Sequence, residues 1–135
     1  MKTPREIVDL MMNSDAFSQW MEIKVEEIGK GHAILTVEIK PEMVNGFHIA
    51  HGGISYSLSD SALAFASNAY GNKCVSIETS ISHTRPAKIG DKLTATCEEL
   101  NRGRTIGIYQ VTVKNQDNKT VALFKGTVHI SEEVW

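Results

Sequence analysis

Hydrophobic residues change their spacing twice along this chain of 135 residues. Residues 5–12 carry apolar side chains at helical spacing, preceded by Thr3 as a candidate N-cap and Pro4 at the first helical position. A second, shorter helical turn follows at 15–21. We expect this N-terminal helical segment, 1–21, to pack on the remainder of the domain and to cover one end of a sheet.

From residue 23 onward, apolar and polar residues alternate, which is typical of β-strands with one buried face. The first two alternating segments, 23–28 and 33–39, flank a glycine-rich turn, and Pro41 ends the second one. They are predicted to form a β-hairpin. Further along the chain, four more segments alternate in the same way: 74–85, 91–101, 105–114 and 120–131.

One long helix is predicted between these two groups of strands, over 53–70, where apolar residues recur every three or four positions and Gly71 ends the pattern. A single alanine-rich, apolar helix among antiparallel strands has to pack against one face of their sheet. We therefore expect one α+β domain, 1–135, in which an antiparallel sheet wraps around a long central helix.

The composition fits one globular domain, with 41% hydrophobic and 22% charged residues. A formal net charge of −2 argues against a nucleic-acid partner. No apolar run is long enough to cross a bilayer, and the first residues lack the apolar region of a signal peptide, so we expect a cytoplasmic protein without a membrane partner. Cys74 and Cys97 are expected to be buried, reduced thiols.

The nine residues 45–53, NGFHIAHGG, stand directly before the long helix. The start of a helix presents unpaired N–H groups that attract negative charge, including a carbonyl oxygen that becomes negative during attack. Gly53 is the expected donor to such an oxyanion. Two turns further on, Asp60 is a lone carboxylate on a mostly apolar helix, where a charge is costly unless it is paired or functional.

An oxyanion donor beside a carboxylate favours hydrolysis of an ester or thioester. Asp60 would either attack the carbonyl itself or activate a water molecule. His51 would either donate a hydrogen bond to the carbonyl or hold the two glycines in shape. The other histidines of this region, His48 and His83, are expected at the surface or at the rim of the site. No group of residues has metal-ligand spacing, so no metal is expected.

Four features together resemble one known family. They are the Asn45-Gly46 pair, the His51-Gly52-Gly53 triplet, the acid nine residues after that histidine, and SHTRPAKIGD at 82–91. Over most of its length the chain is similar to the PaaI-type acyl-CoA thioesterases, which have the hotdog fold. The resemblance implies an acyl-CoA substrate, water as acceptor, and no cofactor beyond the coenzyme A of the substrate. It also implies homodimers with active sites at the dimer interface, paired into homotetramers.

The resemblance further implies roles for individual residues. Asn45 would orient substrate or water, Gly52 would contact the substrate, and Ser67 would reach the site across the dimer. Thr79 and Ser82 would hold the attacking water. Basic residues at predicted strand ends would form a cluster that meets the phosphates of coenzyme A: Arg85, Lys88, Arg102 and Arg104. Candidates for the acyl pocket are Met43, Phe47, Ile49 and Tyr56.

The expected function is hydrolysis of an aryl- or medium-chain acyl-CoA. Two alternatives use the same fold: a non-catalytic acyl-CoA sensor and a hydratase. Sensors of this kind carry a DNA-binding module ahead of the hotdog domain, whereas only about twenty non-basic residues precede the first predicted strand here. Hydratases place an acid before the central helix, whereas this chain has Asn45 there and Asp60 on the helix, which favours the thioesterase.

Overall fold

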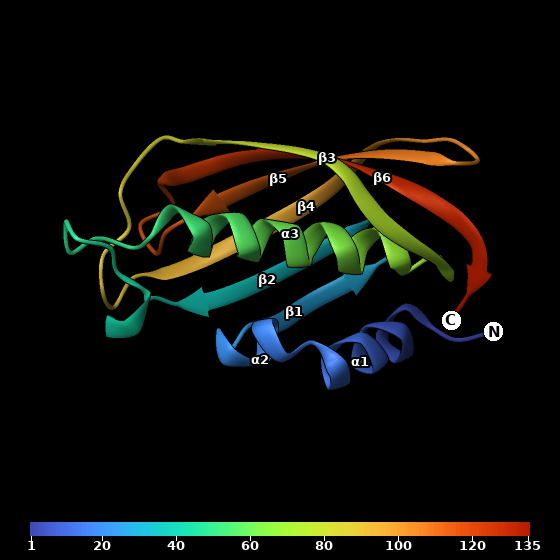
Figure 1. The fold of residues 1–135 in the computed structure, drawn as a ribbon, viewed down its shortest axis with the longest axis horizontal. Helices are drawn as coiled ribbons and strands as arrows, with labels where there is room; N and C mark the ends of the chain where they lie inside the picture. The colour runs from blue at the N-terminus through green and yellow to red at the C-terminus, as the bar shows by residue number, and fades with distance from the viewer.

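Six antiparallel strands form a single sheet in the computed structural model, which describes residues 1–135. The sheet curves around one long helix, α3 (Gly52–Asn68), so the expected α+β hotdog arrangement is confirmed (Figure 1). The order across the sheet is β1-β2-β4-β5-β6-β3. The strands are β1 (Lys24–Gly29), β2 (His32–Glu38), β3 (Asn72–His83), β4 (Lys92–Arg102), β5 (Ile106–Lys114) and β6 (Thr120–Val134).

The core lies between α3 and the concave face of the sheet. Leu58, Ala62 and Phe65 form the buried side of α3 and have no exposed surface. Alternate residues of the strands meet them, as the period of two predicted. A short 3-10 helix, η1 (Pro41–Met43), then carries the chain from β2 toward the loop that begins α3.

A glycine in β6 allows α3 to approach the sheet closely. Gly126 pairs with Tyr109 of β5 and Thr79 of β3, the two strands that flank β6. A methyl group at this position would lie 2.5 Å from Cδ2 of Leu63 on α3 and 3.1 Å from Phe124. Because both neighbours are buried, a side chain at position 126 would push the helix and the sheet apart.

The N-terminal segment forms α1 (Pro4–Ser14) and α2 (Ala16–Trp20). Thr3 and Glu6 cap the start of α1 reciprocally, as the sequence suggested for Thr3. The two helices do not cover an end of the sheet, which corrects the expectation. They lie beside α3 and along β1, with Ile7 and Val8 buried (Figure 1). The two helices thus extend the helical layer beside α3, on the same face of the sheet.

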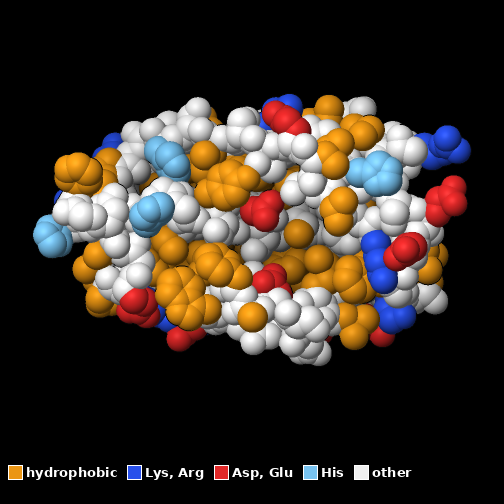
Figure 2. Space-filling model, viewed as in Figure 1, with side chains coloured by type: hydrophobic (Ala, Val, Ile, Leu, Met, Phe, Trp, Pro, Cys, Tyr) orange, Lys and Arg blue, Asp and Glu red, His pale blue; other side chains and the backbone are white.

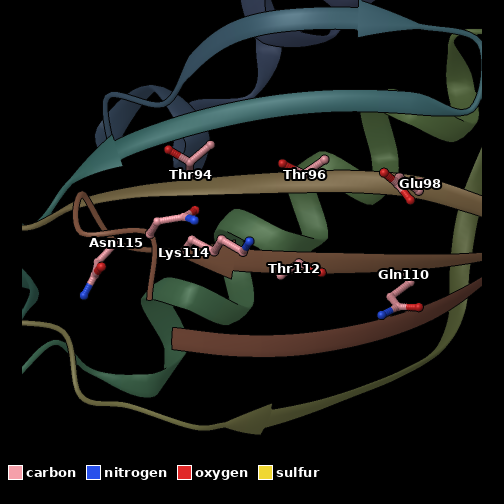
Figure 3. A pocket seen from close by; sticks show the side chains of 8 residues that line it. Thr94, Thr96, Glu98, Gln110, Thr112, Lys114 and Asn115 are labelled. Atoms are coloured by element: carbon pink, nitrogen blue, oxygen red, sulfur yellow. The ribbon is translucent and has the colours of Figure 1, made fainter. Parts of the chain in front are cut away.

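The outer face of the sheet is polar. A hollow of about 460 Å³ lies there, on the side turned away from α3 (Figure 3). It has one carboxylate and no histidine or cysteine, so it offers no set of groups for attacking a carbonyl. Its lining residues are Thr94, Thr96, Glu98, Gln110, Thr112, Lys114, Asn115 and Asn118. None of the helices combines the length and the apolar character that crossing a bilayer requires.

Because α3 lies so close to Gly126, a methyl group added there should destabilise the protein more than a methyl group added at Gly29. Gly126→Ala should lower the free energy of unfolding by about 1–3 kcal/mol, the usual cost of overpacking a core. Gly29→Ala is the matched control, because a methyl group there meets nothing within 4 Å. Chemical denaturation would measure both. In a Leu63→Ala background the Gly126→Ala loss should shrink, and an undiminished loss would contradict the proposed contact.

Candidate active site

The first residue of α3 keeps its backbone donor free. His51 is the N-cap of α3, and its Nδ1 accepts the Gly53 N–H at 2.9 Å. The Gly53 N–H, expected to be free, is therefore engaged within the chain. The Gly52 N–H makes no hydrogen bond with any group of the chain. Because Nδ1 of His51 accepts, its ring carries the proton on Nε2 when neutral. The helix start thus presents the Gly52 N–H as its unpaired donor.

Asn45 shapes this loop. Its Oδ1 accepts the backbone N–H of Phe47 at 2.9 Å and that of Ile49 at 3.4 Å. An asparagine that bonds to the backbone two residues later forms an Asx turn, which fixes the path of the loop. The side-chain amide of Asn45 makes no further bond within the chain and lines the adjacent pocket.

That pocket has a volume of about 450 Å³ and lies between the loop, the start of α3 and the end of β3. Four residues expected from the sequence line it: Asn45, Ile49, Gly52 and Arg85. His83 lines it as well, with Nδ1 3.3 Å from Oγ of Ser55; it is exposed, as expected of a surface or rim residue, but we assigned it no role. The alternation of β3 was the available signal, because it places position 83 on the inward face.

Asp60 lies in a different hollow, of about 250 Å³, together with Ser67, Cys74 and Ser76. Its carboxylate is partly buried and makes no hydrogen bond or ion pair within the chain. Burial raises the pKa of Asp60, and repulsion from the carboxylate of Asp15, the N-cap of α2, raises it further. On the face of the molecule that Figure 2 shows, acidic side chains lie near the middle, among hydrophobic ones. A half-buried acid without a partner is typical of a functional site.

One chain does not bring the free N–H and the carboxylate together. Gly52 and Asp60 are eight residues apart on one helix, which corresponds to about 12 Å along its axis. A reacting carbonyl has to lie within about 3 Å of its donor and close to the attacking group. The two halves of the expected site are therefore both present on α3 but separated.

The hydroxyl residues divide between the two faces of the sheet. Thr79 points inward, and its hydroxyl hydrogen-bonds with the Tyr56 hydroxyl of α3. Ser67 is buried and donates to the Ala64 carbonyl at 3.2 Å. Ser82 lies on the outer face beside Leu123, away from α3, so it does not face Asp60 of its own chain, and its contact with the attacking water stays a prediction. Ser76, which we did not single out, lies beside Asp60 instead. The register of β3 shifts between Ser76 and Glu78, and this bulge places Ser76 and Ser82 on opposite faces although they are an even number of residues apart.

The basic residues do not form the expected cluster. Arg85 and Lys88 lie in the loop between β3 and β4, at the end where α3 begins. Arg102 lies where α3 ends: its guanidinium is 3.8 Å from the centroid of the Tyr70 ring and donates to the Ser67 carbonyl at 3.4 Å. Strand ends that look alike in sequence thus fall at opposite ends of the sheet, because neighbouring strands run antiparallel.

The candidates for the acyl pocket are also separated. Met43 is only 2% exposed and belongs to the core, whereas Phe47 is 84% exposed at the tip of the loop. Ile49 lines the pocket that contains Gly52. Tyr56 stands on α3, with its ring packed edge-on against Phe124.

Both cysteines are free and buried, as expected. Burial raises the pKa of Cys97 to about 12 and also raises that of Cys74. Neither thiol is therefore activated as a nucleophile at neutral pH. No group of three or more histidine, cysteine or acidic side chains is arranged to hold a metal ion.

The raised pKa of Asp60 has a consequence for stability. The folded state holds this proton more tightly than the unfolded chain, so folding loses stability as the pH rises above about 3.9, the unfolded value. Asp60→Asn should raise the free energy of unfolding at about pH 7 by about 0.5–2 kcal/mol. The gain should vanish near pH 3, where both states are protonated. Asp9→Asn, at an exposed acid of α1, is the control. Equal gains at both pH values would contradict the assignment.

Comparisons with known proteins agree with the fold described above. A family model described as the thioesterase superfamily matches residues 47–122. The acyl-coenzyme A thioesterase PaaI of Escherichia coli is 37% identical over 119 residues, which cover 88% of this chain and 85% of that protein. The solved structure of Escherichia coli PaaI has a TM-score of 0.95 at 34% identity, covering 97% of this chain and 95% of that one.

A Streptococcus mutans protein solved with acetyl-CoA bound is 29% identical, with a TM-score of 0.81 over 84% of this chain and 91% of that one. The family match covers more than half of this chain, and PaaI matches it almost from end to end. The chain therefore belongs to the thioesterase superfamily, as a PaaI-like member with the hotdog fold.

Proposed function

We propose that this protein hydrolyses acyl-CoA thioesters, using the Asp60 carboxylate and the Gly52 N–H. The observation that carries the proposal is an unpaired, half-buried acid on a helix whose first N–H is free. The relatives support it, since PaaI is named an acyl-coenzyme A thioesterase and the Streptococcus mutans protein binds acetyl-CoA. In this proposal the Gly52 N–H takes the role first expected of Gly53, whose own N–H is bound to His51.

The separation along α3 leads us to propose a site shared by two chains. If two copies of α3 lie side by side and antiparallel, with their twofold axis near Tyr56, Gly52 of one chain stands opposite Asp60 of the other. Position 56 is the midpoint between the two residues. Each dimer then has two complete sites, and each site takes its donor and its carboxylate from different chains.

The free edge of β3 supports this dimer. It is the last strand of the sheet, spans 12 residues, and has no neighbour on one side. Val75 is 65% exposed and Ile77 is 57% exposed. A long edge strand with exposed apolar residues is a template for pairing with another chain. Pairing of two β3 edges would continue the sheet and bring the two helices together.

The chemistry follows from the charges. Asp60 removes a proton from water as the water attacks the thioester carbon, or attacks that carbon itself. Its raised pKa makes the carboxylate a stronger base than an exposed aspartate. The carbonyl oxygen becomes negative and is stabilised by the Gly52 N–H, which His51 and the Asx turn of Asn45 hold in position. Collapse of the intermediate expels the thiolate of coenzyme A.

The acyl group is expected to be aryl or of medium length. Ile49 and Tyr56 are the apolar candidates nearest the proposed donor and the helix midpoint. A panel of phenylacetyl-, benzoyl-, hexanoyl- and palmitoyl-CoA would define the preference, with release of the thiol as the readout.

Asp60→Asn should lower kcat on the best substrate of this panel by at least about a hundredfold, because it removes the base or nucleophile. Circular dichroism and sedimentation should show an unchanged fold and assembly. Asp9→Asn is the charge-matched control and should keep full activity. Normal turnover by a folded Asp60→Asn protein would refute the role of this residue.

A mixing experiment tests the shared site. Gly52→Pro removes the proposed donor while keeping a helix-compatible residue, since position 52 is the first of α3 and His51 has ψ of 137°, which a following proline accepts. Gly52→Ala is the matched control, because it keeps the N–H and adds the same Cβ. We expect Gly52→Pro to be far less active than Gly52→Ala.

Refolding equal amounts of Gly52→Pro and Asp60→Asn together should restore about a quarter of the wild-type activity. Half of the dimers are then mixed, and each mixed dimer has one intact site. Activity no higher than that of the separate variants would show that donor and carboxylate do not come from different chains.

A further inference from the structure

His83 lies next to the proposed oxyanion donor, yet the chemistry above does not use it. A Cβ placed on Gly52 would lie 3.1 Å from Nε2 of His83 and 3.4 Å from its Cε1. The imidazole therefore packs against the first residue of α3. The other ring nitrogen, Nδ1, is 3.3 Å from Oγ of Ser55. Among the side chains that line this pocket, only Arg85 carries another charge, and none is acidic.

Ser55 determines which nitrogen of His83 exchanges a proton. The Ser55 hydroxyl donates to the Gly52 carbonyl at 3.3 Å, so its Oγ is left to accept a hydrogen bond. The partner that can donate is Nδ1–H of His83. With Nδ1 protonated, Nε2 is the nitrogen that gains and loses a proton. Ser55 is buried, whereas His83 is exposed, so the contact with Ser55 is what orients the ring at the rim of the pocket.

Thioester hydrolysis ends with a basic leaving group. An alkyl thiol such as the cysteine side chain has a pKa of about 8.5, so its thiolate is expelled more readily if a proton reaches the sulfur. A carbonyl oxygen that accepts the Gly52 N–H lies about 2.9 Å from that nitrogen. The sulfur is two bonds from this oxygen and can therefore approach Nε2 of His83.

We propose that His83, held by Ser55, is the general acid that protonates the sulfur of the leaving coenzyme A. As the tetrahedral intermediate collapses, the oxyanion re-forms the C=O bond and the C–S bond breaks with its electron pair on sulfur. The sulfur takes the proton from Nε2, which leaves neutral His83 and free thiol. The proton that Asp60 removed from water returns through solvent and restores the imidazolium. This step rests on the proposed thioesterase function.

The test compares two thioesters of the same acyl group. One is the coenzyme A ester, and the other is an ester of an aryl thiol such as 5-mercapto-2-nitrobenzoate, whose thiolate is stable and leaves without a proton. His83→Gln should lower kcat/KM for the coenzyme A ester by at least about tenfold. For the aryl thioester it should stay within about twofold of wild type. His83→Phe, a second replacement in case glutamine disturbs the fold, should give the same pattern.

Ser55→Ala keeps the imidazole but frees its Nδ1, and should cause a smaller loss on the coenzyme A ester alone. His129→Gln, at an exposed histidine of β6, is the control and should leave both activities unchanged. Equal losses of His83→Gln on both thioesters would overturn the proposal, since they would indicate a role in structure or binding, and so would the absence of any loss.

Asp60→Asn, assayed on the same two thioesters, separates this proposal from the proposed function. It should abolish both activities whatever His83 does, because attack on the carbonyl precedes expulsion of either thiol. Retained activity of Asp60→Asn on both thioesters would refute the proposed role of Asp60 and leave the result for His83 standing on its own.

Discussion

The packing of α3 into the concave face of the sheet is the constraint on which the rest of the structure depends. Buried residues along one side of the helix fix its rotation, and the approach of Leu63 to Gly126 fixes its distance from the sheet. Rotation and distance together decide where the unburied side of α3 points. That side carries Asp60, and the start of the same helix carries the Gly52 N–H. The core therefore positions both proposed reacting groups without contacting a substrate.

The electrostatics of the site oppose folding. A carboxylate with no hydrogen-bond donor, placed in a partly buried hollow and repelled by Asp15, is less stable as an anion than an exposed one. A protein tolerates such a cost when the group has a use, and a more basic carboxylate is the better proton acceptor. The Gly52 N–H at the start of α3 is a similar case. A donor without a partner is also unfavourable until an oxyanion accepts its hydrogen bond.

The division of the site explains why a single chain looks incomplete. A straight helix keeps two residues at a fixed separation, so Gly52 and Asp60 cannot converge on one carbonyl by any local rearrangement. In a symmetric dimer the second copy of α3 runs antiparallel to the first, so that Gly52 of one chain stands opposite Asp60 of the other. In the proposed dimer, pairing of two exposed β3 edges brings two copies of α3 side by side.

The sequence by itself determined the elements and the kind of chemistry. Periods of two and near 3.6 located the six strands and α3, because side-chain direction follows backbone geometry directly. The lone acid on an apolar helix identified Asp60 for the same local reason. The tertiary structure alone decided which polar groups were left unpaired and which residues met. The His51 hydrogen bond moved the free donor from Gly53 to Gly52. The bulge in β3 between Ser76 and Glu78 put Ser82 and Ser76 on opposite faces, and the antiparallel order of the strands separated Arg102 from Arg85. The His51 bond is local but depends on the side-chain rotamer, which spacing does not specify. The other two outcomes depend on the pairing of strands distant in the chain, and local spacing contains no information about it.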